Sequence, residues 1–170
     1  MTLYPRLRMR TSLEEREPSG GPRHRTVRPS DAAAIGELML AAYRGTVDDE
    51  GETLGDAVAE VDRVLAGSYG PFLFVASFVV ERGGPGTGLV GASLAALWES
   101  RPLLLYLVVH PEMKRRGVGT YMLTRTGNAL LAAGHPELDL FVTEANRPAV
   151  NLYRKLGFRV IERVEGPAGA

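Results

Sequence analysis

The chain has 170 residues, of which 45% are hydrophobic, so it is long enough for one domain with a substantial core. Lys and Arg number 20, as do Asp and Glu, and this balance excludes a protein that binds nucleic acid through its overall charge. The absence of Cys excludes disulfides and thiolate chemistry and fits a reducing compartment, so we expect a cytoplasmic protein. No stretch of the sequence reaches the roughly 18 apolar residues that a membrane span needs.

The first 25 residues differ in composition from the rest of the chain. They are rich in Arg, Glu, Gly and Pro and contain no apolar run of the kind that a signal peptide carries. This composition is typical of a mobile segment. We therefore expect an N-terminal extension over 1–25 and one folded domain over 26–170, although a few apolar residues in the extension leave its order open.

The first half of the domain contains two amphipathic helices. A short strand is expected over 26–29, followed by a helix whose apolar residues recur at i, i+3, i+4 and i+7 over 35–42. Thr53 and Asp56 have the spacing of a capping box and predict a second helix that ends before Gly67.

The second half alternates strands and helices. Residues 72–80 and 89–98 predict a hairpin, and the fully apolar run 103–109 predicts a strand covered on both faces. The remaining predicted elements are a helix over 117–133, a strand over 138–142, a helix over 147–156 and a strand over 158–164. Hairpins followed by crossover units indicate a mixed sheet with helices on both faces, an α/β domain of three layers.

The sequence KRRGVG, residues 114–119, joins the most apolar strand to a long helix. The first N–H groups of a helix have no partner within it, so an anion is stabilised there, and Gly117 and Gly119 leave the backbone accessible. Lys114, Arg115 and Arg116 add positive charge suited to a pyrophosphate. Glycines at helix starts and surface arginines are also common without a ligand. Neither a P-loop nor a complete dinucleotide fingerprint is present.

Two sequence blocks carry a resemblance to a known family. YLVVHPEMKRRGVGTYML (106–123) resembles the acetyl-CoA signature of the GNAT-type N-acetyltransferase superfamily, in which a strand precedes [RQ]-x-x-G-x-[GA] at a helix start. LDLFVTEANRPAVNLYRKLGF (138–158) resembles a later block of the same superfamily. The resemblance covers 26–164 and departs from the pattern at Lys114, which keeps the charge.

This resemblance implies a GNAT-like α/β/α fold with a splayed pair of central strands, and acetyl-CoA as co-substrate. It implies that Leu107, Val108 and Val109 offer backbone groups to the pantetheine arm, with Val109 as donor to the thioester carbonyl, and that Asn146 faces the same arm. The residues expected to hold the pyrophosphate are Lys114, Arg115, Arg116, Gly117, Val118, Gly119 and Thr120.

The resemblance also implies that Tyr153 acts as general acid toward the departing thiolate and contacts the cofactor, although a tyrosine packed on an amphipathic helix gives the same pattern. No base carries over, because Phe141 stands where one branch of the superfamily has glutamate. Glu99, Glu144 or a water chain are the candidates.

The stretch 46–62 carries seven acidic residues and no Lys or Arg, and such a wall attracts a cationic amine. We expect Asp48 and Asp49, with Tyr43 and Trp98, to border the site of a small cationic amine or a peptide N-terminus; a solvated helix face is the alternative. Three scattered histidines offer no metal spacing, so no metal is expected.

Other functions remain open at this point. A non-catalytic module that binds acyl-CoA would have the same phosphate turn. A nucleic-acid binder that uses the arginines is disfavoured by the neutral charge and the lack of interleaved aromatic residues. We therefore expect neither a nucleic-acid nor a membrane partner, and a homodimer is compatible with the sequence.

Overall fold

The structure is a computed structural model that describes residues 4–18, 20–84 and 86–166. Its sheet has seven strands in the order β2-β3-β4-β5-β6-β1-β7. The strands are β1 (Arg6–Ser12), β2 (His24–Thr26), β3 (Phe78–Glu81), β4 (Leu89–Trp98), β5 (Arg101–Val109), β6 (Glu137–Thr143) and β7 (Arg159–Val164). The α-helices in this part of the chain are α1 (Ala32–Tyr43), α2 (Leu54–Leu65), α3 (Val118–Ala132) and α4 (Arg147–Lys155).

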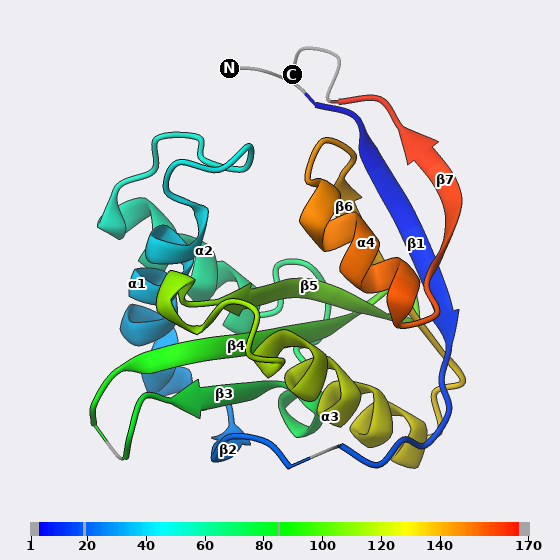
Figure 1. Ribbon diagram of the computed structural model, residues 1–170, viewed down its shortest axis with the longest axis horizontal. Helices are drawn as coiled ribbons and strands as arrows, with labels where there is room; N and C mark the ends of the chain where they lie inside the picture. Colours follow the sequence, from blue (N-terminus) through cyan, green and yellow to red (C-terminus); the bar gives the residue numbers. More distant parts are fainter. Residues whose placement is uncertain (1–3, 19, 85, 167–170) are drawn as a thin grey trace.

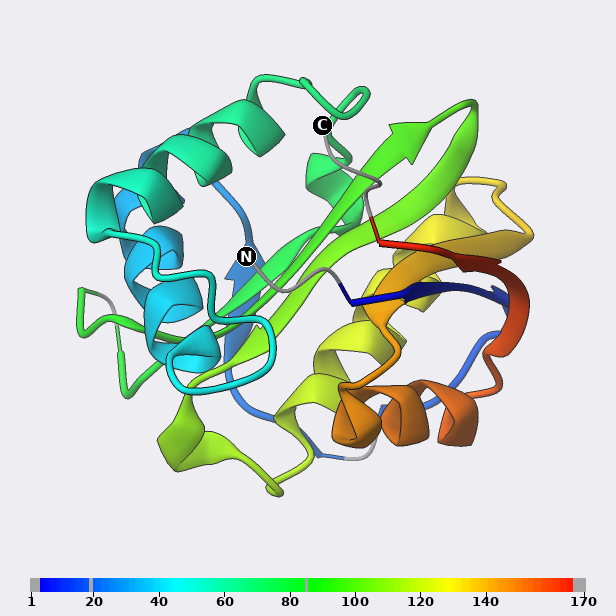
Figure 2. The same ribbon diagram turned by 90° about the horizontal axis from the view of Figure 1, so that it is seen from above.

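The helices cover both faces of the sheet. Helices α1 and α2 lie on one face, and α3 and α4 lie on the other (Figures 1 and 2). Ile35, Leu38 and Met39 of α1 are buried against the sheet, as their helical spacing predicts, and Met122 and Leu130 of α3 are buried on the opposite face. The three-layer α/β architecture expected from the sequence is confirmed. Among the described residues, no helix is both long and apolar enough to cross a membrane.

The capping box predicted for the second helix is present. The Asp56 amide donates to Thr53 Oγ1 at 3.1 Å, and the Thr53 amide donates to Asp56 Oδ2 at 2.9 Å. These bonds satisfy donors that would otherwise be unpaired at the start of α2. They fix where the connection from α1 ends, and that connection borders the site described below.

The N-terminal segment differs from the expectation. Residues 6–12, which composition assigned to an extension outside the domain, form β1, and β1 pairs antiparallel with both β6 and β7. Leu7, Met9 and Thr11 alternate inward and are buried. The intervening arginines made the segment look like a mobile tail, whereas they are the polar half of a period-two strand. Residues 1–3 of the predicted extension lie outside the described residues.

The arginines of β1 meet one buried carboxylate. Asp139 of β6 is 0% exposed and accepts hydrogen bonds from Arg8 Nη2 at 2.8 Å and from Arg10 Nε at 2.6 Å. Burial alone raises the pKa of Asp139, but the hydrogen bonds from Arg10 and Arg8 outweigh it and lower this pKa. The ion pairs of Arg8 and Arg10 with Asp139 therefore help to fix the register of β1 against β6.

Two predicted strands have different limits. Within 72–80, residues Phe74–Ala76 form a 3-10 turn, and only 78–81 pair as β3. Ser77 Oγ accepts a hydrogen bond from the Ala95 amide at 3.0 Å, so a side chain replaces the strand pairing at this point. The first predicted strand, 26–29, is instead His24–Thr26, because Pro29 begins another 3-10 turn.

The central strands β5 and β6 diverge. They run parallel but pair only at Leu103 with Asp139 and at Leu104 with Leu140. The register of β5 against β4 shifts at Leu105, which has no partner, and such a bulge bends a strand. The splayed central pair expected from the sequence is confirmed, and it opens the sheet beyond Leu104.

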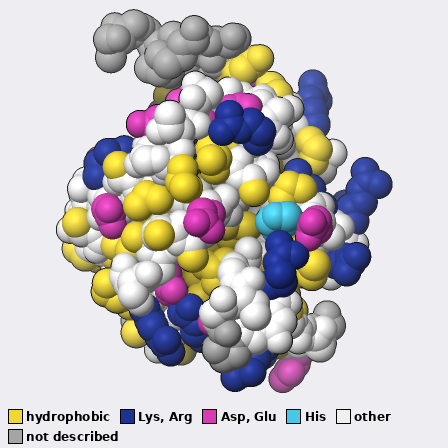
Figure 3. All heavy atoms as spheres, turned by 90° about the vertical axis from the view of Figure 1, so that its left-hand side faces the viewer, with side chains coloured by type: hydrophobic (Ala, Val, Ile, Leu, Met, Phe, Trp, Pro, Cys, Tyr) yellow, Lys and Arg dark blue, Asp and Glu magenta, His cyan; other side chains and the backbone are white. Residues whose placement is uncertain are grey.

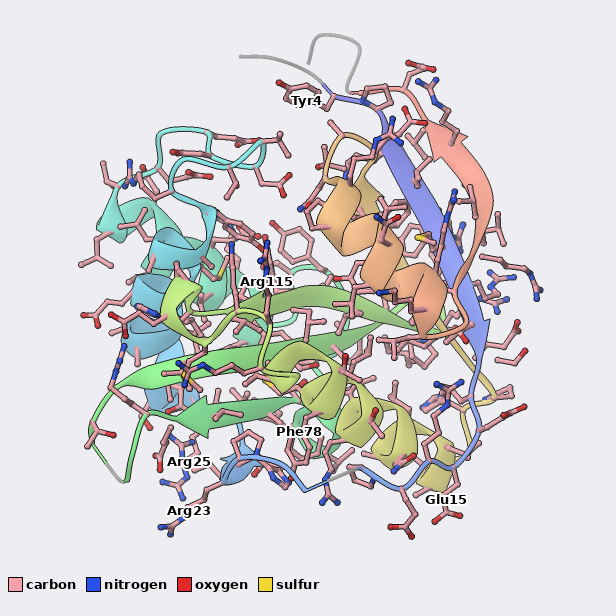
Figure 4. The ribbon with its side chains drawn as sticks, in the orientation of Figure 1. Tyr4, Glu15, Arg23, Arg25, Phe78 and Arg115 are labelled. Carbon is pink, nitrogen blue, oxygen red and sulfur yellow. The ribbon has the colours of Figure 1, made fainter. Side chains whose placement is uncertain are left out.

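The burial of β1 leads to a prediction about stability. Met9→Ala should lower the free energy of unfolding by about 2–5 kcal/mol, because it removes a fully buried side chain from a core strand. Arg23→Ala is the control, since Arg23 is exposed and points outward (Figure 4), and it should change stability by less than about 0.5 kcal/mol. Urea unfolding measures both variants. Equal stability of the two would contradict a structural role for β1.

Candidate active site

A cavity of about 1100 Å³ lies where β5 and β6 diverge. Its walls come from α1, the loop between α1 and α2, α2, β5, β6 and the first turns of α4. The lining residues that bear on the chemistry are Arg6, Tyr43, Asp48, Asp49, Glu50, Glu52, Asp56, Glu60, Arg63, Tyr106, Leu107, Asn146 and Tyr153. Figure 1 shows the same arrangement, with α1 and α2 on one side of the end of β5 and β6 and α4 on the other.

The open edge of β5 presents unpaired backbone groups to this region. The His110 amide donates to the Val90 carbonyl, which fixes the phase of the hydrogen bonds between β4 and β5. Because amides alternate in direction along an antiparallel strand, those of Leu107 and Val109 point away from β4 toward the open edge. The backbone of Val108 points instead to Ala92 of β4. Among the three residues predicted to offer backbone groups, Leu107 and Val109 are therefore suitably oriented and Val108 is not.

The loop before α3 presents a row of free amides. Within the described part of the chain, the backbone N–H groups of residues 115–120 have no hydrogen-bond partner. Gly117 has φ 76°, a conformation that favours glycine, and it turns the chain into α3. Lys114, Arg115 and Arg116 form no ion pair with any described residue, and Arg115 projects away from the loop in Figure 4. The predicted phosphate turn thus combines six free donors with three uncompensated cations.

Gly119 connects this loop to the cavity. A Cβ at Gly119 would lie 3.6 Å from Val109, 3.8 Å from Leu152 and 4.0 Å from Leu107. The start of α3 therefore lies against side chains of β5 and α4, and one of these residues, Leu107, also lines the cavity.

Asn146 joins α4 to the loop between α1 and α2. Its Oδ1 accepts a hydrogen bond from the Ala149 amide at 3.3 Å and caps α4, while its Nδ2 donates to Asp48 Oδ2 at 2.9 Å. Thr143 Oγ1 donates to the other oxygen of Asp48 at 2.7 Å. Asp48 therefore closes the acidic loop onto the corner between β6 and α4.

Tyr153 lies at the same corner with a free hydroxyl. Its side chain is 9% exposed, and its ring packs edge-on against Phe158 with 5.7 Å between ring centroids. The hydroxyl has no hydrogen-bond partner among the described residues, and Tyr153 lines the cavity. Burial, and to a lesser extent the negative charge of Asp48, raises the pKa of Tyr153 to about 12. The hydroxyl is therefore protonated at neutral pH.

The two carboxylates predicted as candidate bases lie outside the cavity. Glu99 has φ 49° in the two-residue turn between β4 and β5, at the far end of β5 from the open edge. Glu144 is paired with Arg163 at 3.0 Å, and this hydrogen bond lowers its pKa. Neither of these two predicted residues borders the cavity.

Trp98 also lies outside the cavity. Its ring meets Phe141 edge-on, with 5.7 Å between centroids, and stacks under the guanidinium of Arg8 at 5.0 Å. These contacts join the end of β4 to β6 and β1. Trp98 therefore supports the sheet instead of bordering the acceptor site as predicted, whereas Tyr43, Asp48 and Asp49 do line the cavity.

Glu60 and Tyr106 also line the cavity; Glu60 belongs to the acidic stretch 46–62 but was not singled out there, and Tyr106 was not among the predicted site residues. Tyr106 OH donates to Glu60 Oε1 at 2.8 Å, and Glu60 Oε2 accepts from Arg63 at 2.6 Å and from Tyr69 OH at 3.0 Å. Burial and the bond to Glu60 raise the pKa of Tyr106. Tyr106 belongs to the apolar run that forms β5. Only its alternating position along the strand could have indicated that its side chain points to the cavity.

The cavity is strongly acidic. Six carboxylates line it and two arginines oppose them. Of the six, only Glu60 forms an ion pair within the described residues. Figure 3 looks onto the side that carries α1 and α2, where acidic side chains are scattered over the face and Lys and Arg side chains lie mostly around its margin. In residues 4–18, 20–84 and 86–166 no group of three His, Asp or Glu could hold a metal ion.

The comparisons with known proteins identify the family. A family model described as "Acetyltransferase (GNAT) domain" matches residues 74–160, which include β4, β5, the phosphate turn, Asn146 and Tyr153. The chain belongs to the GNAT acetyltransferase family. The splayed strands and the amide-lined turn lie within the matched range, and the chain is an acyltransferase that uses acetyl-CoA.

Relatives and solved structures agree with this assignment. The chain is 29% identical over 107 residues to an acetyltransferase of Pectobacterium atrosepticum, covering 63% of this chain and 70% of that protein. It is similar to a GCN5-related N-acetyltransferase from Sphaerobacter thermophilus (TM-score 0.71, 18% identity), covering 96% of this chain but only 50% of that one. It is also similar to yncA, a putative acetyltransferase from Salmonella typhimurium solved with acetyl-CoA (TM-score 0.62, 22% identity, covering 84% and 82%).

Proposed function

We propose that this GNAT domain transfers the acetyl group of acetyl-CoA to a primary amine of a cationic acceptor in the cavity between β5 and β6. The observation that supports this most strongly is the set of free backbone amides, at residues 115–120 and at Leu107 and Val109, in a domain whose cavity also contains the unpartnered hydroxyl of Tyr153. These groups suit a ligand with an anionic end and a reactive end.

The residues present fit acetyl-CoA. The free N–H groups of 115–120, with Lys114, Arg115 and Arg116, suit its diphosphate, since N–H groups at a helix start stabilise anions. The backbone of Leu107 and Val109 suits the amides of the pantetheine arm. When bound, acetyl-CoA supplies the acetyl group as a thioester.

We assign two donor roles in the reaction to two residues, Val109 of β5 and Tyr153 of α4. The Val109 amide points to the open edge and is the donor that we assign to the oxyanion formed at the thioester carbonyl. Tyr153 OH is the donor that we assign to the departing sulfur. Because the pKa of Tyr153 is raised, the proton that this step requires is on the hydroxyl at neutral pH.

Carboxylates of the cavity replace the two bases suggested by the sequence. Asp48 and Glu60 both line the cavity, and each keeps lone pairs beyond its present hydrogen bonds. A carboxylate acts as proton acceptor for an ammonium group directly or through one water. We assign to Asp48 the proton of the incoming amine, because it lines the cavity together with Tyr153 and bonds to Asn146, the N-cap of the helix that carries Tyr153.

Calorimetry followed by an enzyme assay tests the proposed function. The full chain should bind acetyl-CoA, and free thiol should then appear when amines are added from a panel of alkylamines, polyamines, amino acids and peptides. Binding of acetyl-CoA without thiol release for any amine would contradict the transferase and favour a non-catalytic acyl-CoA-binding module.

Gly119→Glu tests the phosphate site. The new carboxylate would lie beside the free amides and repel a diphosphate, so acetyl-CoA should bind at least about tenfold more weakly by calorimetry. Gly55→Glu is the matched control, because Gly55 is likewise the second residue of a helix and has only Thr53 within 4 Å of its added Cβ. Unchanged affinity in Gly119→Glu would place the diphosphate elsewhere.

Tyr153→Phe tests the proton donor. Turnover should fall about hundredfold, the usual contribution of a positioned acid, while the affinity for acetyl-CoA stays within about threefold. Tyr121→Phe removes an equally buried hydroxyl that bonds to His24, away from the cavity, and should retain turnover. Full activity of Tyr153→Phe would exclude this role.

A further inference from the structure

We infer that the acceptor is a small molecule with a second cationic group, held by the rim of the acidic cavity while its first amine reacts at Tyr153. This inference rests on the proposed function and extends it from a reaction type to a class of acceptor. The rim is defined as Glu50, Glu52 and Asp56, which lie at the end of the loop between α1 and α2 and at the start of α2.

The carboxylates of the loop and the rim lack cationic partners. None of Asp48, Asp49, Glu50, Glu52 and Asp56 forms an ion pair with a described residue. Asp48 and Asp49 are held by neutral donors instead, among them the amides of Gly45 and Gly51, which bond to Asp49 at 2.8 and 3.0 Å.

The cations around the cavity leave most of this charge uncompensated. Arg63 is committed to Glu60 at 2.6 Å, and Arg6 lies over the ring of Phe141 at 5.3 Å. Arg44 donates to the backbone carbonyl of Glu52 and not to a carboxylate. Like charges so close together repel one another, so the arrangement favours a bound cation.

The reacting amine does not account for this charge. The reacting amine enters as an ammonium ion and gives up one proton before it attacks, so it brings at most one positive charge to the five carboxylates of the loop and the rim. One carboxylate is enough to accept its proton, and Asp48, which bonds to the N-cap residue of the helix that carries Tyr153, is placed to do so. The negative charge at the rim therefore matches a different part of the acceptor, a second ammonium or guanidinium group.

Tyr153 offers an acceptor a second point of contact in this cavity. The residue is 9% exposed, it lines the cavity, and its hydroxyl has no hydrogen-bond partner among the described residues. An occupant that bonds to Tyr153 and places a cation at the rim uses both features, and the cavity volume of about 1100 Å³ suits a small molecule.

Binding to the full chain saturated with CoA, which cannot transfer an acetyl group, tests the inference by calorimetry. We expect 1,5-diaminopentane to bind about tenfold more tightly than pentylamine, a difference of about 1.4 kcal/mol. The double variant Glu50→Gln/Glu52→Gln should reduce this ratio to about threefold or less, because it keeps the shape of the rim and removes its charge.

The matched control is Glu37→Gln/Asp62→Asn. It removes the same charge from exposed positions that do not line the cavity, so the diamine should keep its advantage. Melting temperatures of both double variants confirm that they fold. A ratio near one in the unmodified protein, or an unchanged ratio in the rim variant, would overturn the inference.

Turnover separates this inference from the proposed function. If both amines are acetylated equally well and bind equally well, the proposed function is supported and the inference of a second cationic group is wrong. If the diamine binds preferentially but no amine releases thiol from acetyl-CoA, the proposed acetyl transfer is wrong and the inference of a cation-binding rim is supported. A peptide with N-terminal lysine that binds more tightly than the diamine would overturn the assignment to a small molecule.

Discussion

The site depends on the early end of the pairing between β5 and β6. Two residue pairs hold these strands together, at Leu103 and Leu104, and a bulge at Leu105 then bends β5 away. Had the ladder continued, the amides of Leu107 and Val109 would be used within the sheet and no cavity would exist. The fold thus leaves hydrogen-bonding capacity unused at its centre, which is costly in a core unless a ligand or water takes it up.

The acidic loop and helix α4 are held together by Asp48. Its carboxylate accepts from Thr143 and from Asn146, and Asn146 also caps α4, the helix that carries Tyr153. The acidic loop, the end of β6 and the start of α4 are therefore connected by three hydrogen bonds. A change of loop position on acceptor binding would reach Tyr153 through this connection.

Local patterns predicted most of the fold, and several of the predicted site residues line the cavity. Helix periodicity, the Thr53 cap and the apolar run of β5 have local causes, and so does the glycine turn before α3. Glu99 and Glu144, the candidate bases, do not line the cavity, because their positions depend on a hairpin turn and on an ion pair with Arg163 that no local pattern shows. The contact between Tyr106 and Glu60 could not be predicted for the same reason, since these residues meet across 46 residues of sequence.

The position of β1 has a consequence for how the chain folds. Strand β1 finds its neighbours, β6 and β7, only among residues 137–164, and Arg8 meets Asp139 across 131 residues. Loop closure of this length is slow, so the sheet is completed late. Until then the edge of β6 is unprotected, and a bulky tag fused directly before β1 would hinder the final step of assembly.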